Sequence, residues 1–440
     1  MKQFILFSIF CLTIGCSTSK KLPNRTVETL NQKITNSPVF QQGFTGFVLF
    51  DPATNQTLES IHGNKFFTPA SNTKTLTYFA TNLVLEDSIP ALKYMIRGDS
   101  LIFAGTGDPS FLNDAFFEND KALDFLKNRK EKLFFTPSNF NDDRYGSGWM
   151  WDDYPYSFQA EKSPFPIYGN TVKFEKATAN TTVEITPKYF EKATTFVEKE
   201  GQSPVVRKEF SNEFEVNLKA ITRFPYERKM PFIYSDTLLV KLLSAEVGKP
   251  ITLLENHAFP TEENQMIYST HTDSLFQKLM QDSDNHIAEQ LLLITSDAVF
   301  GNMNAADFIQ FAKDSLMKDL EEKPLWADGS GVSRYNKITP NQNINFLTKI
   351  YQTTPFAALK KIFPTGGVNG TIEDWYPGNP PYVFAKTGTL RGVHCLSGYL
   401  ETKSGRQLIF SFMHNNFPFS SSNLKTEMQV MLEWIRDNYD

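Results

Sequence analysis

Residues 69–86 read PASNTKTLTYFATNLVLE, and this stretch decides how the rest of the chain is interpreted. Pro69 and the polar run from Ser71 to Thr73 are typical of a helix start, and apolar residues then recur at helical spacing. We therefore predict an amphipathic helix that opens near Ser71. Because Ser71 and Lys74 are three residues apart, they lie on one face of that helix, where the amine can reach the hydroxyl.

A hydroxyl beside an amine indicates nucleophilic catalysis. A serine hydroxyl is a poor nucleophile until an adjacent base takes its proton. A lysine can be that base only where burial or a second cation lowers its pKa. Lys386, in the one Lys-Thr-Gly of the sequence, is a natural second cation. A helix N-terminus at Ser71 adds positive potential where an oxyanion would form.

Three short motifs occur in order along the chain: Ser71-Asn-Thr-Lys74, Ser283-Asp-Asn285 and Lys386-Thr-Gly388. Singly they carry little information, since Ser-x-x-Lys alone occurs four times. Their settings carry more. The first motif opens a predicted helix, the second stands just before another (286–300), and the third ends an apolar run that reads as a strand.

Each motif offers a distinct function toward a peptide substrate. Ser283 can relay a proton between the lysine of the first motif and a leaving amine, and the side-chain amide of Asn285 can hold a substrate amide. A strand with Lys386 and Thr387 can pair with an extended peptide while these two side chains hold its carboxylate. Gly388 has no Cβ, so a substrate can approach the backbone closely there.

This set of motifs is the one found in penicillin-binding proteins and serine β-lactamases. The interval between Ser71 and Ser283 is much longer than in a β-lactamase. The chain therefore resembles the D-alanyl-D-alanine carboxypeptidase/endopeptidases of the penicillin-binding protein 4 type, the low-molecular-mass class C penicillin-binding proteins, from about residue 40 to the C-terminus. The matching stretches are PASNTKT (69–75), GTGDPS (105–110), GWMWDD (148–153), DGSGVSR (328–334) and KTGTL (386–390).

The resemblance implies an α/β fold: a transpeptidase/β-lactamase-like domain with an antiparallel sheet, helices on both faces and a mostly β insertion. The sequence pattern agrees, since two β-rich runs around a turn (43–61) precede the first helix and three strand-like runs precede the last one. In the middle of the chain, short apolar runs alternate with turn residues. We expect the first half of the domain at 38–97, the insertion at 98–265 and the second half at 266–440.

The same resemblance implies a serine-type peptidase acting on peptidoglycan stem peptides that end in D-Ala-D-Ala. It makes Ser71 the nucleophile, Lys74 the general base and Ser283 the proton relay. It gives the oxyanion hole to the backbone N–H groups of Ser71 and Thr389. β-Lactams would acylate the same serine as substrate mimics, and no metal or organic cofactor is implied. Substrate would be bound by Asn285, Lys386, Thr387 and Gly388.

Two other functions remain open from the sequence. A β-lactam receptor or peptidoglycan-binding lipoprotein would be acylated but would not turn over. A β-lactamase or esterase of the same fold would hydrolyse its acyl group, although the long insertion disfavours it. The choice between trimming a terminal D-Ala and cutting a cross-link is open as well, because both are acyl transfers from D-Ala.

Residues 1–16, MKQFILFSIFCLTIGC, have one lysine followed by an apolar run too short to span a bilayer, which is typical of an export signal. The Gly15-Cys16 pair resembles a bacterial lipoprotein cleavage site and implies lipidation at Cys16, with plain secretion as the alternative. We expect residues 17–37 to form a polar tether and the mature protein to be periplasmic and anchored to a membrane by lipid. Cys395 is expected as a buried small hydrophobe rather than a nucleophile.

The composition excludes several other classes of protein. The net charge is −5 with Lys and Arg scattered, which argues against nucleic-acid binding. Three cysteines are too few for a disulfide framework or an all-cysteine zinc site. His286 and Glu289 are three residues apart on a predicted helix, but without a third ligand we expect a surface or capping role for them rather than a metal site.

Two further stretches are open to interpretation. Ser330 and Arg334 lie in a Gly/Ser-rich stretch to which the resemblance gives a supporting role near the cleft. An aromatic cluster can either line a substrate groove or form the core of a small β domain. It consists of Trp149, Trp151, Tyr154 and Tyr156.

Overall fold

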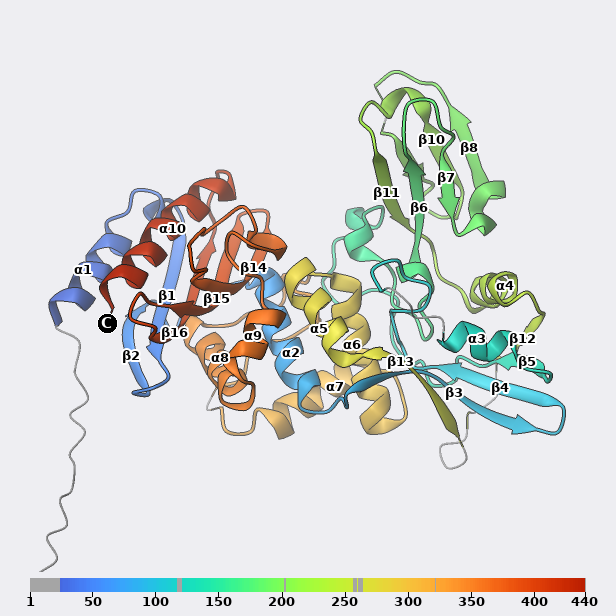
Figure 1. Cartoon of the computed structure of the whole chain (residues 1–440), viewed down its shortest axis with the longest axis horizontal. Coiled ribbons are helices and arrows are strands. Elements are labelled where there is room, and N and C mark those ends of the chain that lie inside the picture. Colours follow the sequence, from blue (N-terminus) through green and yellow to red (C-terminus); the bar gives the residue numbers. More distant parts are fainter. Residues whose placement is uncertain are drawn as a thin grey trace, which may run out of the picture.

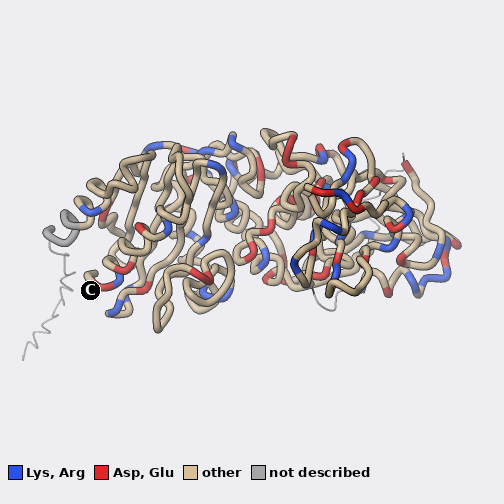
Figure 2. Tube along the Cα trace, turned by 90° about the horizontal axis from the view of Figure 1, so that it is seen from above, with Lys and Arg blue, Asp and Glu red and all other residues tan. Residues whose placement is uncertain are grey.

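The chain folds into two lobes, which Figure 1 shows at opposite ends of an elongated molecule. The first and last described elements of the chain meet in one lobe, and the middle of the sequence forms the other. Figure 2 shows acidic and basic residues scattered over the whole length. The expected export signal and Cys16 lie outside the described residues. The computed structural model describes residues 24–439 apart from 117–120, 202, 256–258, 260–263 and 321.

The first lobe is built on an antiparallel sheet in the order β14-β15-β16-β1-β2. β1 pairs with β16, with Phe47 opposite Phe412, so strands from the two ends of the chain lie side by side. β14 is an edge strand, and a bridge between Thr365 and Phe384 covers the start of its outer side. The strands are β1 (Phe44–Asp51), β2 (Gln56–Ile61), β14 (Val383–Leu390), β15 (Val393–Glu401) and β16 (Gln407–Asn415).

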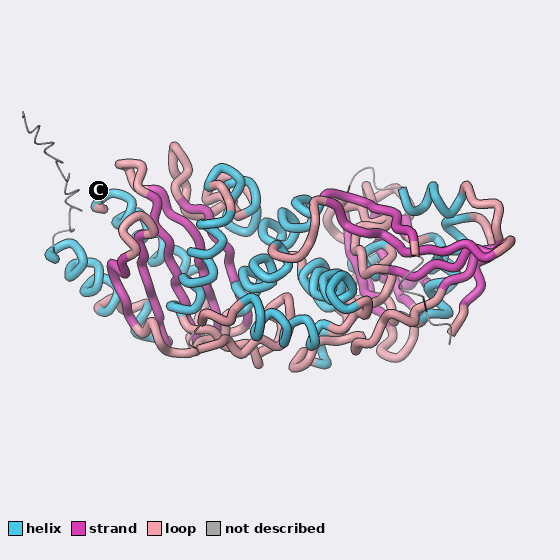
Figure 3. Tube along the Cα trace, turned by 90° about the horizontal axis from the view of Figure 1, so that it is seen from below, coloured by secondary structure: helices cyan, strands magenta, loops and turns pink. Residues whose placement is uncertain are grey.

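Helices cover both faces of this sheet, as Figure 3 shows. Successive residues of β1 point to opposite faces, so Phe47 packs in the core that includes α10, and Val48 packs in the core that includes α2 and α6. The expected antiparallel sheet with helices on both faces is therefore confirmed. The helices of this lobe are α1 (Asn24–Thr35), α2 (Lys74–Asn82), α5 (Thr272–Gln277), α6 (Asn285–Phe300), α7 (Ala305–Phe311), α8 (Pro340–Thr353), α9 (Phe356–Ile362) and α10 (Ser421–Asn438).

The segment expected to be a tether is helical over most of its described part. In α1, Leu30 and Ile34 are one turn apart on the same face, and both are buried in the core that α10 shares with the sheet. The polar composition of residues 17–37 concealed these two apolar anchors, so the expectation of a tether was wrong for Asn24–Thr35. No helix in the described part of the chain is long and apolar enough to cross a membrane.

The described residues of the second lobe form three sheets, in the orders β12-β5-β4-β3-β13, β11-β6-β7 and β8-β10-β9. Two helices pack with them, α3 (Lys121–Lys127) and α4 (Asp236–Val247). The strands are β3 (Ser88–Arg97), β4 (Ser100–Gly105), β5 (Lys132–Phe135), β6 (Thr171–Lys176), β7 (Glu184–Thr186), β8 (Thr194–Val197), β9 (Val205–Arg207), β10 (Phe214–Asn217), β11 (Tyr226–Pro231), β12 (Ile251–Leu253) and β13 (Gln265–His271).

The expected boundaries of the insertion, at 98 and 265, differ from the sheet that the chain forms. β3 and β13 pair with each other, with Gln265 opposite Tyr94, although the sequence assigned them to the two halves of the other domain. Pairing between segments so far apart in sequence leaves no local signal. We propose that the inserted part of the chain runs from Ser88 to His271.

Candidate active site

Ser71 lies at a sharp turn directly before α2. Residues Ala70–Thr73 form one turn of 3-10 helix, and Lys74 begins the α-helix. Lys74 Nζ donates a hydrogen bond of 3.1 Å to Ser71 Oγ, so the predicted meeting of amine and hydroxyl is present. Both groups therefore face the same side of α2.

The Lys74 amine is fully buried and is held by neutral oxygen atoms. Besides Ser71 Oγ, its Nζ contacts the side-chain oxygen of Asn285 and the backbone oxygen of Ser330, each at 2.6 Å. No carboxylate among the described residues contacts it within hydrogen-bond distance. A buried amine without a contacting counter-charge is poorly stabilised as a cation.

Burial is the main cause of the altered pKa values of both site lysines. Burial lowers the pKa of Lys74 to about 8, although the charges of Asp328, Glu289 and Asp284 oppose the change. The pKa of Lys386 lies well below its ordinary value, first through burial and then through the charge of Lys74. Lys386, the second cation expected to lower the pKa of Lys74, is not among the causes of that change, which comes from burial; the charge of Lys74 acts on Lys386 instead.

The second motif brings Ser283 and Asn285 to this amine. A π-helical turn, Lys278–Asp282, ends at Ser283, whose φ of 59° is left-handed. Asp284 then caps α6 by accepting a hydrogen bond from Ile287 N at 2.9 Å. As the first residue of α6, Asn285 presents its oxygen to Lys74, while its Nδ2 donates to Phe158 O at 2.9 Å.

The third motif lies along β14, on the other side of the serine. Lys386 Nζ donates to Ser283 Oγ at 2.8 Å and to Thr387 O at 2.9 Å. A Cβ placed on Gly388 would lie 2.4 Å from Pro69 O and 3.0 Å from Ser71 N, so β14 can lie this close only because residue 388 is glycine. The three motifs therefore meet at one site.

Thr387 and Thr389 differ in their surroundings along the same strand. The Thr387 hydroxyl is hydrogen-bonded to the Thr371 hydroxyl at 2.7 Å and is nearly buried. Thr389 is exposed, and its hydroxyl lies 2.9 Å from Nδ1 of His394. Thr389 thus lies on the accessible part of β14, just past the glycine that contacts the serine turn.

A buried carboxyl for which the sequence suggested a surface or capping role supports the site. Glu289 is fully buried, and its two oxygens accept hydrogen bonds from Ser330 N at 2.8 Å and Gly329 N at 3.2 Å. The carbonyl of Ser330 is the one that holds Lys74. Burial, aided by the charge of Asp328, raises the pKa of Glu289 to about 7. The available signal was its position one turn after Asn285 on the same helix face.

Asp328 organises the loop that carries this carbonyl. Its carboxylate accepts hydrogen bonds from Gly331 N at 2.9 Å, Ser333 N at 2.7 Å and the Trp149 indole at 2.9 Å. The supporting role expected for Ser330 is thus carried by its backbone. Arg334 lies on the surface, where its guanidinium donates to Arg391 O at 3.3 Å.

The aromatic cluster is not the core of a small β domain. Trp151 is 76% exposed, and Tyr156 stacks on Phe158 at 5.4 Å between ring centroids with both rings partly exposed. Tyr154 lies against the Arg207 guanidinium, 5.0 Å from its ring centroid. The segment that carries these aromatic residues contacts the site, because the backbone oxygen of Phe158 accepts a hydrogen bond from the Asn285 side chain.

Comparison with known proteins assigns the family. Residues 26–221 and 254–438 match the D-Ala-D-Ala carboxypeptidase 3 (S13) family. The chain is 23% identical over 480 residues to D-alanyl-D-alanine carboxypeptidase DacB of Haemophilus influenzae, covering 100% of this chain and 99% of that protein. It is also 23% identical over 444 residues to a D-alanyl-D-alanine carboxypeptidase of Actinomadura sp., covering 87% and 79% of the two chains.

The fold is shared with a solved structure of similar size. The crystal structure of penicillin binding protein 4 from Haemophilus influenzae superposes with a TM-score of 0.75 at 22% identity, covering 93% of this chain and 99% of that one. The family match includes all three motifs and most of the chain. This protein is therefore a member of the D-Ala-D-Ala carboxypeptidase 3 (S13) family.

Proposed function

We propose that this protein is a serine-type D-Ala-D-Ala carboxypeptidase/endopeptidase that acts on peptidoglycan stem peptides through an acyl-enzyme at Ser71. The observation that carries the proposal is the buried Lys74 amine, 3.1 Å from the Ser71 hydroxyl and without a contacting carboxylate in the described chain. Membership of a carboxypeptidase family supports the same reaction.

In the acylation step, the neutral Lys74 amine accepts the Ser71 proton. The hydrogens of the amine remain hydrogen-bonded to the Asn285 and Ser330 oxygens, each 2.6 Å from Nζ, so the nitrogen lone pair can face the Ser71 hydroxyl. Ser71 Oγ attacks the carbonyl carbon of the penultimate D-Ala. The backbone N–H groups of Ser71 and Thr389 stabilise the oxyanion that forms.

Collapse of this intermediate requires a proton on the leaving nitrogen. Ser283 is suited to deliver it, because its Oγ is 2.8 Å from the Lys386 amine and the neighbouring Asn285 holds Lys74. The Ser283 hydroxyl gives its proton to the leaving nitrogen and regains one from the Lys74 ammonium, which returns Lys74 to its neutral form. The C–N bond breaks, D-Ala departs, and the stem peptide remains as an ester on Ser71.

In the deacylation step, water attacks the ester carbonyl and gives its proton to the Lys74 amine. The ester C–O bond breaks, Ser71 regains its proton, and the shortened stem peptide leaves with a carboxylate. The substrate would lie along the accessible part of β14, with its amide on Asn285 and its terminal carboxylate on Lys386 and Thr387.

β-Lactams are expected to acylate Ser71 by the same chemistry. Opening of the lactam C–N bond leaves the cleaved amine attached to the acyl group, so it cannot depart as D-Ala does. The adduct is therefore long-lived and can be located by mass spectrometry. Acylation at any residue other than Ser71 would contradict the proposal.

The decisive activity test combines labelling and turnover. Purified protein is exposed to fluorescent penicillin, and D-Ala release is measured from a diacylated peptide ending in D-Ala-D-Ala. We expect labelling and release by the wild-type protein and neither by Ser71→Ala. Labelling without release would support the receptor alternative, and rapid penicillin hydrolysis would support the β-lactamase alternative.

We also propose that the protein is exported to the periplasm and anchored to a membrane by lipid on Cys16. The apolar run that ends in Gly15-Cys16 supports this proposal. In cells, Cys16→Ala is expected to move the protein from the membrane fraction to the soluble fraction. An unchanged partition would contradict the lipid anchor and leave the enzymatic proposal intact.

A further inference from the structure

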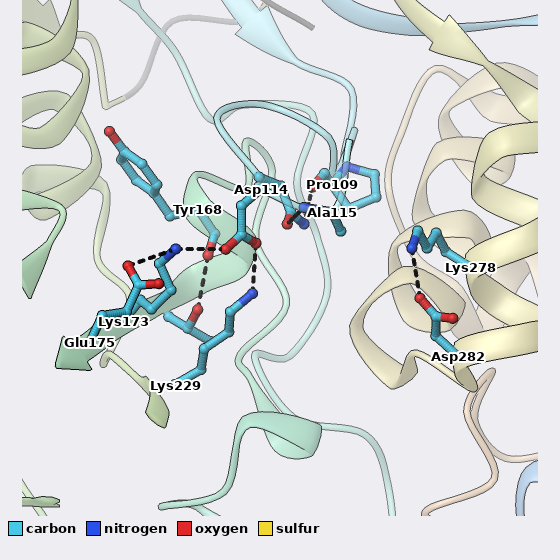
Figure 4. A network of polar contacts seen from close by, with 11 residues as sticks. Pro109, Asp114, Ala115, Tyr168, Lys173, Glu175, Lys229, Lys278 and Asp282 are labelled. Atoms are coloured by element: carbon cyan, nitrogen blue, oxygen red, sulfur yellow. Dashed lines mark hydrogen bonds and ion pairs between the residues drawn. The ribbon is translucent and has the colours of Figure 1, made fainter. Parts of the chain in front are cut away.

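The charged groups of the inserted part beside the Ser283 loop are balanced within the protein. Figure 4 shows Lys173 between Asp114 and Glu175, with a carboxylate oxygen of each at 2.9 Å from Nζ. Lys229 contacts the second oxygen of Asp114 at 2.6 Å. Two carboxylates therefore match two lysines there. The sheet of the first lobe holds polar groups of a different kind, buried rings in which one nitrogen atom has no partner.

A row of four polar side chains crosses this sheet, starting on β14. Successive members of the row lie opposite each other in the strand register, so all four side chains are on one face of the sheet. The row consists of Thr389, His394, His414 and Thr45. The proposed mechanism uses the backbone of the first residue and none of the other three.

Each end of the row is a threonine hydroxyl bonded to a buried imidazole. Thr389 Oγ1 lies 2.9 Å from Nδ1 of His394, and Thr45 Oγ1 lies 2.9 Å from Nδ1 of His414. Both rings are buried, and neither Nε2 atom has a hydrogen-bond partner among the described residues. The two pairs are therefore alike in geometry, and what is learned from one applies to the other.

The direction of the hydrogen bond follows from the end of the row that is far from β14. Thr45 Oγ1 donates its single hydrogen to Phe40 O at 3.1 Å, so it must accept the bond from His414. Nδ1 of His414 therefore carries the proton, and its unpartnered Nε2 is a bare acceptor. This arrangement is the less costly one, because a buried N–H without a partner is rarer than an acceptor without one.

The same reasoning gives the direction of the bond at Thr389. Burial lowers the pKa of His394 to about 3, so at pH 7 the ring is neutral, with one N–H and one bare nitrogen. A proton on Nε2 would be buried without a partner, which favours the form with the proton on Nδ1. The Thr389 hydroxyl then accepts from His394. Its own hydrogen is left for the accessible side of β14, where Thr389 is exposed.

We propose that His394 is a positioning residue for the reaction at Ser71, because its Nδ1–H fixes the Thr389 hydroxyl as a hydrogen-bond donor toward a peptide lying along β14. The proposal rests on the proposed function, which supplies the peptide. The partner of the hydroxyl is an oxygen acceptor of that peptide. His394 is fully buried, so it acts only through Thr389.

The first test measures the position of the ring protons by nitrogen-15 NMR on the full protein labelled at histidine. The variants His394→Asn and His414→Asn assign the signals, and the chemical shifts distinguish a protonated from a bare ring nitrogen without any turnover. We expect the proton on Nδ1 in both rings. A proton on Nε2 of His394 would overturn the proposal, because the Thr389 hydrogen would then be bonded to the ring.

The second test measures kcat/KM for D-Ala release from a diacylated D-Ala-D-Ala peptide. His394→Leu removes the donor, His394→Asn keeps a side-chain N–H near the position of Nδ1, and Thr389→Val removes the hydroxyl. The matched control is His414→Leu, which removes a buried imidazole of the same row whose bonded hydroxyl donates away from β14. Melting temperatures show how far each variant is destabilised.

We expect Thr389→Val and His394→Leu each to lower kcat/KM about tenfold, the loss of one hydrogen bond to the substrate. His394→Asn should recover most of this loss, and His414→Leu should keep the wild-type value. Because His394 acts through the hydroxyl, the double variant should lose no more than Thr389→Val alone. Losses that multiply in the double variant, or an equal loss in His414→Leu, would assign the effect to packing and overturn the proposal.

Failure of the proposed function has a different signature. A wild-type protein that released no D-Ala would overturn that function. The ring tautomers, and the same comparison of variants on the rate of acylation by penicillin, would still decide the role of His394.

Discussion

Two pairs of lysines in this protein have opposite electrostatic surroundings. Lys74 and Lys386 are fully buried and are held by hydroxyl, amide and carbonyl oxygens, and their pKa values are lowered. Lys173 and Lys229 are partly exposed and share the carboxylate of Asp114. For Lys173, burial would lower the pKa, but its hydrogen bonds to Glu175 and Asp114 raise it overall.

This difference shows how one residue type serves two functions. Lys74, buried without a contacting carboxylate, is released toward its neutral form and can act as a base, whereas buried Lys386 donates to Ser283 and is proposed to meet the substrate carboxylate. An amine paired with carboxylates at a partly wet surface remains a cation and can bind anions. Substitutions in and around each pair would show whether burial or pairing decides what each lysine does.

The largest effect is expected from Lys74→Met, which removes the proposed base but preserves much of the buried volume. The rate constant for penicillin acylation of Ser71 should fall by about 10²–10⁴-fold, because general base catalysis contributes that much. Stopped-flow or gel-based labelling measures it. Retention of a near wild-type rate would remove Lys74 from the mechanism.

The next effect is expected from Gly388→Ala. The added Cβ would lie 2.4 Å from Pro69 O and must displace β14 from the serine turn. Since small displacements of reacting groups are costly, kcat/KM for D-Ala release should fall by about 10²-fold. The melting temperature, measured alongside, separates this loss from unfolding. Unchanged kcat/KM would show that β14 can shift freely.

Glu289→Gln should have a smaller effect on activity and a characteristic effect on stability. An amide replaces one acceptor by a donor, so the Gly329–Ser330 backbone loses a hydrogen bond and kcat/KM should fall about tenfold. Because burial raises the pKa of Glu289 from 4.5 to about 7, the free energy of unfolding of the wild-type protein should decrease as the pH rises through this range.

The variant lacks the titrating carboxyl, so its free energy of unfolding should decrease less between pH 4.5 and 7. Denaturant unfolding at several pH values gives the comparison. If the free energy of unfolding has the same pH dependence in both proteins, the pKa of Glu289 is not raised in the folded state. If Glu289 only positions the loop that holds Lys74, Glu289→Gln should have a reduced kcat/KM with the same pH–rate profile as the wild-type protein.

The smallest effect is expected from Lys173→Met, which removes the lysine that is paired with Asp114 and Glu175. Partly exposed ion pairs contribute about 1 kcal/mol or less, so the free energy of unfolding should change by no more than that. Acylation by penicillin should keep its wild-type rate. A large loss of acylation would mean that the two lysine pairs are coupled, and the contrast between them would fail.

The sequence predicted those features of the site that follow from local geometry. The spacing of Ser71 and Lys74 along a helix brings the amine to the hydroxyl. The missing Cβ of Gly388 was expected to admit a substrate, whereas in the structure it lets β14 lie against the serine turn. Helical spacing places Glu289 one turn after Asn285 on the same face, but its burial depends on a loop forty residues further on, which that spacing does not reveal. The expectation of a surface or capping role therefore failed for both Glu289 and His286, which are buried.

Long-range pairing limited the prediction of the fold in the same way. The terminal strands and helices were evident from their periodicity, and the antiparallel sheet is confirmed. β3 pairs with β13 although about 170 residues separate them, so the sheet of the inserted part extends beyond the expected boundaries at 98 and 265. In α1, two apolar residues within a polar segment decided the packing.

The most direct test of the account is the pH dependence of Ser71 acylation between pH 6 and 9.5. If Lys74 must be neutral to act, the acylation rate constant should rise about tenfold per pH unit at low pH and level off above a pKa of about 8. A rate that does not change across this range would contradict the central claim that burial converts Lys74 into a base.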